Sequence, residues 1–324
     1  MKKKILIVTT GGTIAMKQNS PFGVVPDDEF TRALLTFPHL NDLAAIHVHE
    51  FANLPSPYIT PQKMLELAKF VDANIAAYDG LVITHGTDTL EETAYFLDLV
   101  LQTEKPVVFT AAMRSASDLG LDGPRNIVGA VRVASNRDSH GKGVLVVMND
   151  EIHYARDVVK TDSGKTDAFL TPAYGLLGII DPDRVIYYRQ SYFREKLHTT
   201  TIETNIDLIK CVSGMDDRHL VASLQAGARA VVLEAFGRGN IPPQIIPAVR
   251  NLMENNILVI VVSRTYTGRV LPEYGYEGGG AYLEKIGVIL GGDLKGPKMR
   301  LKLMILFGKF PDPERVREYL RQHN

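Results

Sequence analysis

The sequence predicts an α/β protein: a large N-terminal domain with a doubly wound, mostly parallel sheet, followed by a smaller C-terminal α/β domain. Two observations support this fold class. Short apolar runs, rich in β-branched residues and without polar alternation, are typical of strands buried on both faces of a parallel sheet. Segments with apolar residues at helical spacing separate these runs, as in doubly wound sheets. The runs lie at 5–10, 80–86, 106–113 and 143–149.

The alternation of apolar runs and helical patterns stops after residue 188, which suggests where the domains divide. We expect domains at 1–188 and 213–324, joined by the polar and weakly periodic stretch 189–212 as a linker. The other expected elements are helices at 60–77, 90–102 and 296–308, strands at 229–237 and 256–265, and a flexible glycine-rich loop at 272–282.

Composition narrows the class of protein. The 324 residues are 45% hydrophobic, and 36 basic and 37 acidic residues give a formal net charge of −1. Because no stretch concentrates basic charge, nucleic acid is not an expected partner. The apolar run after Lys2, Lys3 and Lys4 is too short for a signal peptide, and no run approaches membrane-spanning length. The single cysteine, Cys211, excludes an intrachain disulfide framework and a multi-cysteine metal site. We therefore expect a soluble cytoplasmic protein without membrane, metal or cofactor.

Nucleotide and metal motifs are incomplete. "TTGGTIAM" (9–16) lacks the third glycine of a dinucleotide-binding loop. "SGKT" (163–166) resembles the end of a phosphate-binding loop, but Val159 occupies the place of its first glycine. The sequence also contains no G-x-S-x-G and no H-E-x-x-H motif.

The first strand ends in a Thr-Thr-Gly-Gly-Thr turn. In an open parallel sheet, ligands bind outside the carboxyl ends of the strands. Gly11 and Gly12 allow a sharp turn there and add little bulk beside a ligand. Thr9, Thr10 and Thr13, which end or follow this strand, are therefore candidate site residues.

The stretch "THGTDTLEE" (84–92) has two interpretations. In the first, Asp88 or Thr89 caps the following helix, and Thr89 with Glu92 forms a capping box. In the second, Thr87 and Asp88 lie under a helix N-terminus, whose N–H groups could bind a carboxylate or a developing oxyanion. Asp88 would then receive a substrate ammonium.

Two further side chains are candidates for proton transfer. Lys160 lies among apolar and acidic neighbours in "DVVKTD" (157–162). It is either a surface lysine or a partly buried one, and burial can enable a lysine to accept a proton from a hydroxyl. His85 is more simply explained as a hydrogen-bonded structural histidine than as a base.

Together these motifs resemble the bacterial-type L-asparaginase family, along nearly the whole chain. The matching stretches are "TTGGTIAM", "VITHGTDTLEETAYFLDL", "FTAAMRSASDLGLDGPRNI", "GVLVVMNDEIHYARDVVKTD", "YGLLGII" and, as the closing helix, "GPKMRLKLMIL". The resemblance implies two-domain α/β subunits that assemble as homodimers or homotetramers, with active sites at subunit interfaces. It also implies hydrolysis of an amino-acid side-chain amide, here that of L-asparagine, to a carboxylate and ammonia without a cofactor.

The resemblance also implies roles for individual residues. Thr13 would be the nucleophile that forms an acyl-enzyme, and Thr87, Asp88 and Lys160 a second catalytic triad. The implied substrate-binding residues are Ser56 for the α-carboxylate, Asp88 for the α-ammonium, Thr87, Ala112, and Asn240 donated across the subunit interface.

The chain departs from the family pattern in three places. Family members usually carry a tyrosine in the mobile loop after the first threonine motif, but "KQNSPFGVVPDD" (17–28) has none, and the matching place is about Phe22 to Val24. Pro57 and Tyr58 follow Ser56 where the family often has Gln and Asp. The neighbour-donated glutamate is missing near Gly280, where only Glu277 is close. Tyr58 is the candidate to supply the missing hydroxyl, with Tyr274 and Tyr276 as alternatives.

These departures leave several functions to compare. The first is hydrolysis of L-asparagine, and the second is hydrolysis of another small amide or a lactam. The third is non-catalytic amino-acid binding, which the retention of Thr13, Thr87, Asp88 and Lys160 disfavours because a sensor needs no nucleophile. A related tRNA-dependent amidotransferase subunit is disfavoured by the balanced charge and by a first strand that starts at about residue 4.

Overall fold

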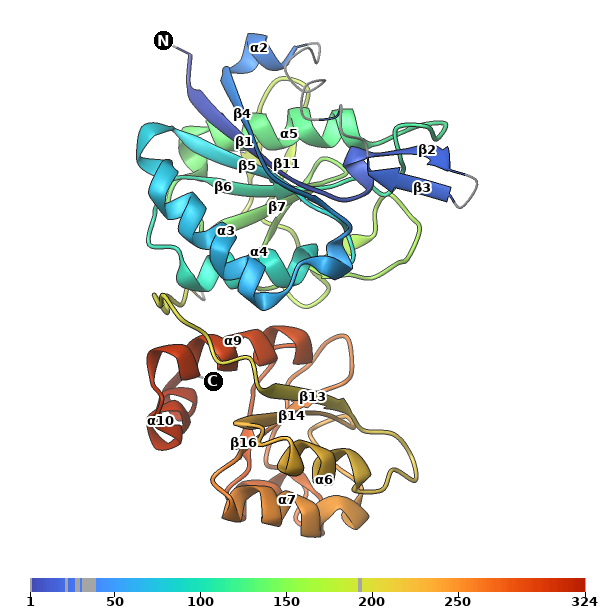
Figure 1. Ribbon diagram of the computed structural model, residues 1–324, viewed down its shortest axis with the longest axis vertical. Coiled ribbons are helices and arrows are strands. Elements are labelled where there is room, and N and C mark those ends of the chain that lie inside the picture. Colours follow the sequence, from blue (N-terminus) through green and yellow to red (C-terminus); the bar gives the residue numbers. More distant parts are fainter. Residues whose placement is uncertain (1, 21–22, 27–29, 31–38, 192–193, 324) are drawn as a thin grey trace. The chain divides into compact units, whose positions relative to one another are not determined.

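Two compact units make up the protein, Met1–Lys196 and Leu197–Asn324. The structure is a computed structural model that describes residues 2–20, 23–26, 30, 39–191 and 194–323 (Figure 1). Both units combine helices with a mainly or wholly parallel sheet, so the expected α/β fold class is confirmed. The chain passes from one unit to the other between Lys196 and Leu197.

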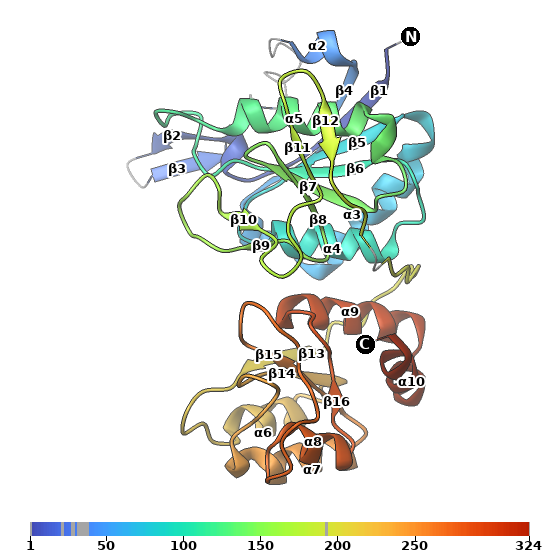
Figure 2. The same cartoon turned by 180° about the vertical axis from the view of Figure 1, so that it is seen from behind.

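The first unit is built on an eight-stranded sheet in the order β12-β11-β8-β7-β6-β5-β1-β4. The five strands from β7 to β4 run parallel, whereas β8, β11 and β12 add antiparallel pairs at the other edge (Figure 2). The strands are β1 (Lys4–Gly11), β4 (Ala45–Leu54), β5 (Gly80–Thr84), β6 (Val107–Thr110), β7 (Val144–Met148), β8 (Glu151–Tyr154), β11 (Gly178–Ile180) and β12 (Val185–Tyr187).

The four apolar runs expected to be strands are β1, β5, β6 and β7. Every residue of β5, β6 and β7 is buried, as a sheet covered on both faces requires. The sequence analysis did not predict β4, which forms the edge of the sheet. Its His47, His49 and Glu50 are exposed, so it lacks the unbroken apolar pattern of the central strands.

Helices cover both faces of the large sheet. Helices α3 and α4 pack together on one face, whereas α5 packs on the other with α2 beside it (Figure 1). Helix α3 starts at Pro61, where the preceding Thr60 hydroxyl accepts a hydrogen bond from the Lys63 N–H (3.3 Å). The helices are α2 (Leu40–Leu43), α3 (Pro61–Asn74), α4 (Leu90–Val100) and α5 (Gly123–Ser135).

Two hairpins lie outside the large sheet. One joins β2 (Met16–Ser20) to β3 (Gly23–Pro26), in the segment that was expected to form the loop without a tyrosine. Phe22 lies outside the described residues. The other joins β9 (Val159–Lys160) to β10 (Phe169–Leu170) and carries Lys160.

The second unit has a four-stranded parallel sheet in the order β13-β14-β15-β16. Helix α9 packs on β13 and β14, and α10 packs on α9. The strands are β13 (Ile206–Lys210), β14 (Ala230–Ala235), β15 (Leu258–Ser263) and β16 (Ile289–Leu290). The helices are α6 (Arg218–Gln225), α7 (Ile246–Glu254), α8 (Gly280–Lys285), α9 (Gly296–Lys309) and α10 (Pro313–His323).

Two expectations for the second unit need correction. The stretch 189–212 is not a linker throughout, because β13 lies within it and pairs with β14 along five residues. Helix α9 is also not the last element. Helix α10 follows it and buries Val316 and Leu320, although most of its residues are charged or polar.

The glycine-rich stretch 272–282 is more ordered than expected. Gly278, Gly279 and Gly280 are buried, and a Cβ on any of them would lie 2.3–2.4 Å from a backbone carbonyl oxygen, that of Ile241, Tyr274 or Leu271. Gly280 also starts helix α8. These glycines therefore permit close backbone packing and do not form a freely flexible loop.

Candidate active site

Three glycines bring together the segments that carry the predicted site residues. Gly12 packs so closely on Gly86 that a Cβ on Gly12 would lie 2.3 Å from the Gly86 Cα. A Cβ on Gly86 would lie 2.6 Å from the Ser56 Cβ, and one on Gly11 would lie 2.4 Å from the Leu54 nitrogen. Gly11 and Gly12 also have φ values of 101° and 84°, which favour glycine. The segments that follow β1, β4 and β5 therefore meet at one edge of the sheet.

Thr13 follows this contact directly and opens the short 3-10 helix η1 (Thr13–Ala15). The Gly12 N–H donates to the Leu54 carbonyl (3.1 Å), and the Ala15 N–H donates to the Gly12 carbonyl (2.8 Å). These two bonds fix the turn at the end of β1. The Thr13 side chain is half-buried, and its hydroxyl forms no hydrogen bond to another described residue. The backbone at Thr13 is therefore fixed, whereas its hydroxyl is available to a substrate.

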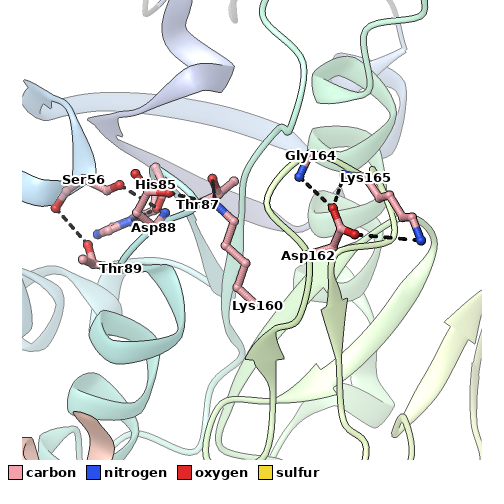
Figure 3. A network of polar contacts seen from close by, with 10 residues as sticks. Ser56, His85, Thr87, Asp88, Thr89, Lys160, Asp162, Gly164 and Lys165 are labelled. Carbon is pink, nitrogen blue, oxygen red and sulfur yellow. Dashed lines mark hydrogen bonds and ion pairs between the residues drawn. The ribbon is translucent and has the colours of Figure 1, made fainter. Parts of the chain in front are cut away.

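Lys160 connects the two polar residues that follow β5. Its Nζ donates to the Thr87 Oγ1 (2.9 Å) and to the Asp88 Oδ1 (2.8 Å), as Figure 3 shows. The Lys160 side chain is 16% exposed, whereas that of Asp88 is 61% exposed. Thr87 is buried. The structure thus brings together the predicted triad and leaves the Asp88 carboxylate accessible to a cationic group.

Ser56 is held against the same loop by hydrogen bonds that reach across the chain. The Asp88 N–H donates to the Ser56 Oγ (3.2 Å), and the Thr89 Oγ1 donates to the Ser56 carbonyl (2.9 Å). Ser56 begins the 3-10 helix η2 (Ser56–Tyr58) and is buried. The Asp88 N–H is therefore already engaged and is not a free donor for an oxyanion.

Thr89 occupies the N-cap position of α4, but the side-chain capping bond of the first interpretation is missing. Its hydroxyl points to Ser56 instead (Figure 3). The Thr89 hydroxyl therefore holds a candidate substrate-binding residue in place, and no local pattern in the sequence indicates this contact.

His85 is a structural residue of the loop. It is fully buried beside the Phe109 ring, and its Nδ1 donates to the Gly86 carbonyl (2.8 Å). Desolvation by burial lowers the pKa of His85 to about 4, although its hydrogen bond to Gly86 acts in the opposite direction. The imidazole is therefore neutral at physiological pH.

This neutral state predicts a pH dependence of stability. Between the ordinary pKa of 6.5 and the folded value of about 4, the unfolded chain binds a proton that the folded chain does not. The free energy of unfolding therefore decreases by about 3 kcal/mol as the pH is lowered from above 6.5 to below 4, and it recovers as the pH is raised again. An NMR titration of the His85 imidazole, assigned with the His85→Gln variant, should show a midpoint near 4. A midpoint near 6.5 would contradict the neutral buried state.

Ala112 lies close to the Thr13 turn. It is fully buried after the end of β6. A Cβ on Gly123 would lie 3.4 Å from the Ala112 Cβ and 3.1 Å from the Ile14 Cγ1. Ala112 is therefore a near neighbour of the residue that follows Thr13.

No described contact joins the side chain of Tyr58 or Asn240 to the cluster formed by Thr13, Ser56, Thr87, Asp88 and Lys160. The Tyr58 side chain is 66% exposed and has no hydrogen bond to Thr13. Asn240 belongs to the second unit, where its N–H donates to the Phe236 carbonyl (3.0 Å). Its Oδ1 is buried and has no hydrogen-bond partner among the described residues.

Other features of the first unit do not overlap with the cluster. A surface pocket of about 470 Å³ lies before the start of β7 and is lined by Asp138, His140, Lys142 and residues 187–190. None of the predicted site residues lines it. Within the ranges that the structure describes, no group of three or more His, Cys, Asp or Glu side chains could hold a metal ion. The same ranges contain no helix that is both long and apolar enough to cross a membrane.

Comparison with known proteins gives the same family for both units. The model of the N-terminal asparaginase domain matches residues 4–193, and that of the glutaminase/asparaginase C-terminal domain matches residues 205–320. An L-asparaginase of Bacillus licheniformis is 35% identical over 96% of this chain and 98% of its own length. A glutaminase-asparaginase of Acinetobacter glutaminasificans is also 35% identical, over 97% of this chain and 98% of its own.

A solved structure supports the same assignment. The probable cytoplasmic L-asparaginase of Campylobacter jejuni is 34% identical, with a TM-score of 0.87 over 99% of both chains. The TM-score shows that the two chains share the same fold. The chain therefore belongs to the bacterial-type asparaginase family of amidohydrolases.

Proposed function

We propose that the protein hydrolyses the side-chain amide of L-asparagine to L-aspartate and ammonia, with Thr13 as the nucleophile. One observation carries the proposal: Lys160 contacts both Thr87 and Asp88 at the sheet edge where the Gly12–Gly86 contact also places Thr13. Membership of the asparaginase family supports the same reaction. The experiment that tests it is ammonia release by the purified protein.

In the proposed first step, the Thr13 Oγ attacks the amide carbon and an aspartyl ester forms. The hydroxyl proton passes to the departing nitrogen, which leaves as ammonia. The accessible Asp88 carboxylate fits the substrate's α-ammonium, and the Ser56 hydroxyl fits its α-carboxylate. The turn between Gly12 and Ala15 holds Thr13 in one position, and a fixed geometry of this kind lowers the entropic part of a barrier.

In the proposed second step, water attacks the ester and releases L-aspartate, which regenerates the Thr13 hydroxyl. The hydrogen bond between the Lys160 Nζ and the Thr87 Oγ1 (2.9 Å) is the route by which these groups exchange a proton with that water. The Asp88 carboxylate, 2.8 Å from the same Nζ, orients the amino group.

Tyr58 is the proposed source of the hydroxyl that the loop at 17–28 lacks. It follows Ser56 by two residues in η2, and its side chain is accessible. Replacing Tyr58 by Phe should lower kcat by about 10-fold or more, because a positioned proton donor or acceptor contributes at least that much. Tyr188→Phe is the matched control. Tyr188 is similarly exposed (62%), but it follows β12, the outermost strand on the side of the sheet opposite β4. If Tyr58→Phe is as active as Tyr188→Phe, Tyr58 has no part in the reaction.

A second candidate function is hydrolysis of another small amide or a lactam. It is favoured by Pro57, which offers neither a side-chain amide nor an N–H beside Ser56. Recognition of the substrate's α-substituents must therefore differ from the common family pattern. The ratio of kcat/KM values for L-asparagine, L-glutamine, D-asparagine and a simple amide separates the two candidates.

The proposal includes the assembly and the compartment of the protein. We propose a homodimer or homotetramer in which Asn240 reaches the active site of a neighbouring subunit, and membership of the asparaginase family supports this proposal. A cytoplasmic location is supported by the single, buried cysteine and by the name of the Campylobacter jejuni relative. Light scattering and cell fractionation measure these two properties.

A further inference from the structure

The hairpin that carries Lys160 has little structure of its own. Strands β9 and β10 are two residues each and pair Lys160 with Phe169 and Val159 with Leu170. One further backbone bond, from the Thr161 N–H to the Ala168 carbonyl (2.7 Å), extends the hairpin. A short two-stranded hairpin is marginally stable without further contacts. The Lys160 Nζ nevertheless lies within hydrogen-bond distance of two oxygens on another loop. Contacts beyond the hairpin must therefore fix its position.

A buried histidine supplies one such contact. His153 lies on β8 of the large sheet and is 1% exposed. Its Nδ1 is 2.9 Å from the Oγ1 of Thr171, which follows the last residue of β10. Thr171 is itself only 5% exposed. The bond thus ties the end of the hairpin to a strand of the main sheet, where His153 pairs with Val146 of β7.

Glu151 provides a charge on the other side of the imidazole. Its Oε2 lies 3.2 Å from the His153 Nε2. Nε2 nevertheless has no hydrogen bond among the described residues. Glu151 and His153 are two residues apart on one strand and therefore share a face.

This carboxylate, imidazole and hydroxyl resemble a nucleophilic triad, but their burial excludes that role. A nucleophile must meet a substrate, and the Thr171 hydroxyl is enclosed between β8 and the hairpin. A buried hydrogen bond between two fixed segments instead restrains their relative position.

We propose that His153, through Thr171, is a positioning residue that holds Lys160 at hydrogen-bond distance from Thr87. This inference rests on the proposed function of the Lys160 site. The imidazole never contacts the substrate, and it acts by restraining the hairpin on which Lys160 lies. Loss of the bond should displace Lys160 and impair the chemical step more than substrate binding.

The test compares Thr171→Val, which removes the hydroxyl at nearly constant shape, with Thr171→Ser, which keeps it. The backbone bond from the Gly175 N–H to the Thr171 carbonyl (2.8 Å) is available to both variants. Thr171→Val should lower kcat on the order of 10- to 100-fold with KM changed less than about 2-fold, as a misplaced catalytic group predicts. Thr171→Ser should keep at least about half of the wild-type kcat, because it restores the hydroxyl that the bond needs. Equal kcat values for the two variants would overturn the proposal.

A second readout does not depend on activity. In a crystal structure of Thr171→Val, the Lys160 Nζ should lie farther than 3.5 Å from the Thr87 Oγ1, compared with 2.9 Å here. An unchanged distance would overturn the positioning role, whether or not the wild-type protein is active. Inactivity of the wild-type protein on every amide would count against the proposed function and not against the positioning role. If Thr171→Val fails to fold, His153→Asn and His153→Leu form the alternative pair, since Asn can occupy the Nδ1 position and Leu cannot bond to Thr171.

Discussion

Replacing Thr13 by alanine should reduce the release of ammonia from L-asparagine by at least about 10⁴-fold, as expected when a catalytic nucleophile is removed. The fold should remain intact, because the side chain is half-buried and its hydroxyl forms no hydrogen bond to another described residue. The turn itself depends on backbone bonds of Gly12 and Ala15, which alanine at position 13 does not affect. Steady-state kinetics and circular dichroism of the same preparation measure both results.

Thr10→Val is the matched control for this variant. Thr10 is three residues earlier in the same motif, but it is 1% exposed and its Oγ1 donates to the Thr84 carbonyl (2.9 Å). Its loss should destabilise the fold by about 1 kcal/mol and leave turnover within about 2-fold of wild type. If Thr13→Ala retains the wild-type rate, Thr13 is not the nucleophile.

Replacing Lys160 by methionine should lower kcat by about 10³-fold, the typical contribution of a positioned acid or base. Methionine keeps most of the side-chain length but cannot bond to Thr87 or Asp88. The stability should change little, because the Asp88 partner is 61% exposed and exposed ion pairs contribute little to folding. Ammonia release and thermal unfolding measure the two effects.

Lys165→Met tests whether any lysine of the hairpin would matter. Lys165 lies in the loop of the same hairpin, with its Nζ 3.8 Å from the Asp162 Oδ2 and no contact with Thr87 or Asp88 (Figure 3). Its replacement should leave kcat within about 2-fold, since it changes only an exposed ion pair. A Lys160→Met variant that keeps more than about a tenth of the wild-type rate would remove Lys160 from the proton-transfer step.

The strand ends that carry Thr13 and Thr87 could be predicted because local sequence determines them. A buried apolar run followed by Gly-Gly or Gly-Thr indicates a strand that ends in a tight turn. The carboxyl ends of parallel strands lie on the same side of the sheet, so Thr13 and Thr87 were expected on that side. What the sequence could not show is how close they are. The contact between Gly12 and Gly86 depends on β1 and β5 being adjacent in the sheet.

Other features depend on contacts between distant segments and have no local pattern. Thr89 and Glu92 fit a capping box, and only the proximity of Ser56, 33 residues earlier, gives the Thr89 hydroxyl a different partner. His153 lies in a short strand with mixed polarity, and its partner Thr171 belongs to a separate hairpin. Strand β13 is short and half-buried, so it resembled a linker until its pairing with β14 was known. The proposed role of Asn240 depends on a second subunit.

The most direct test of the proposed function is ammonia release from L-asparagine, L-glutamine, D-asparagine and a simple amide by the purified wild-type protein, with Thr13→Ala as the blank. We expect rapid release from L-asparagine that is absent in the blank, together with stoichiometric formation of L-aspartate. Release only from another amide would support the second candidate function, hydrolysis of a different small amide or a lactam. Release from none of the four substrates by the folded protein would contradict the proposal that this site hydrolyses amides.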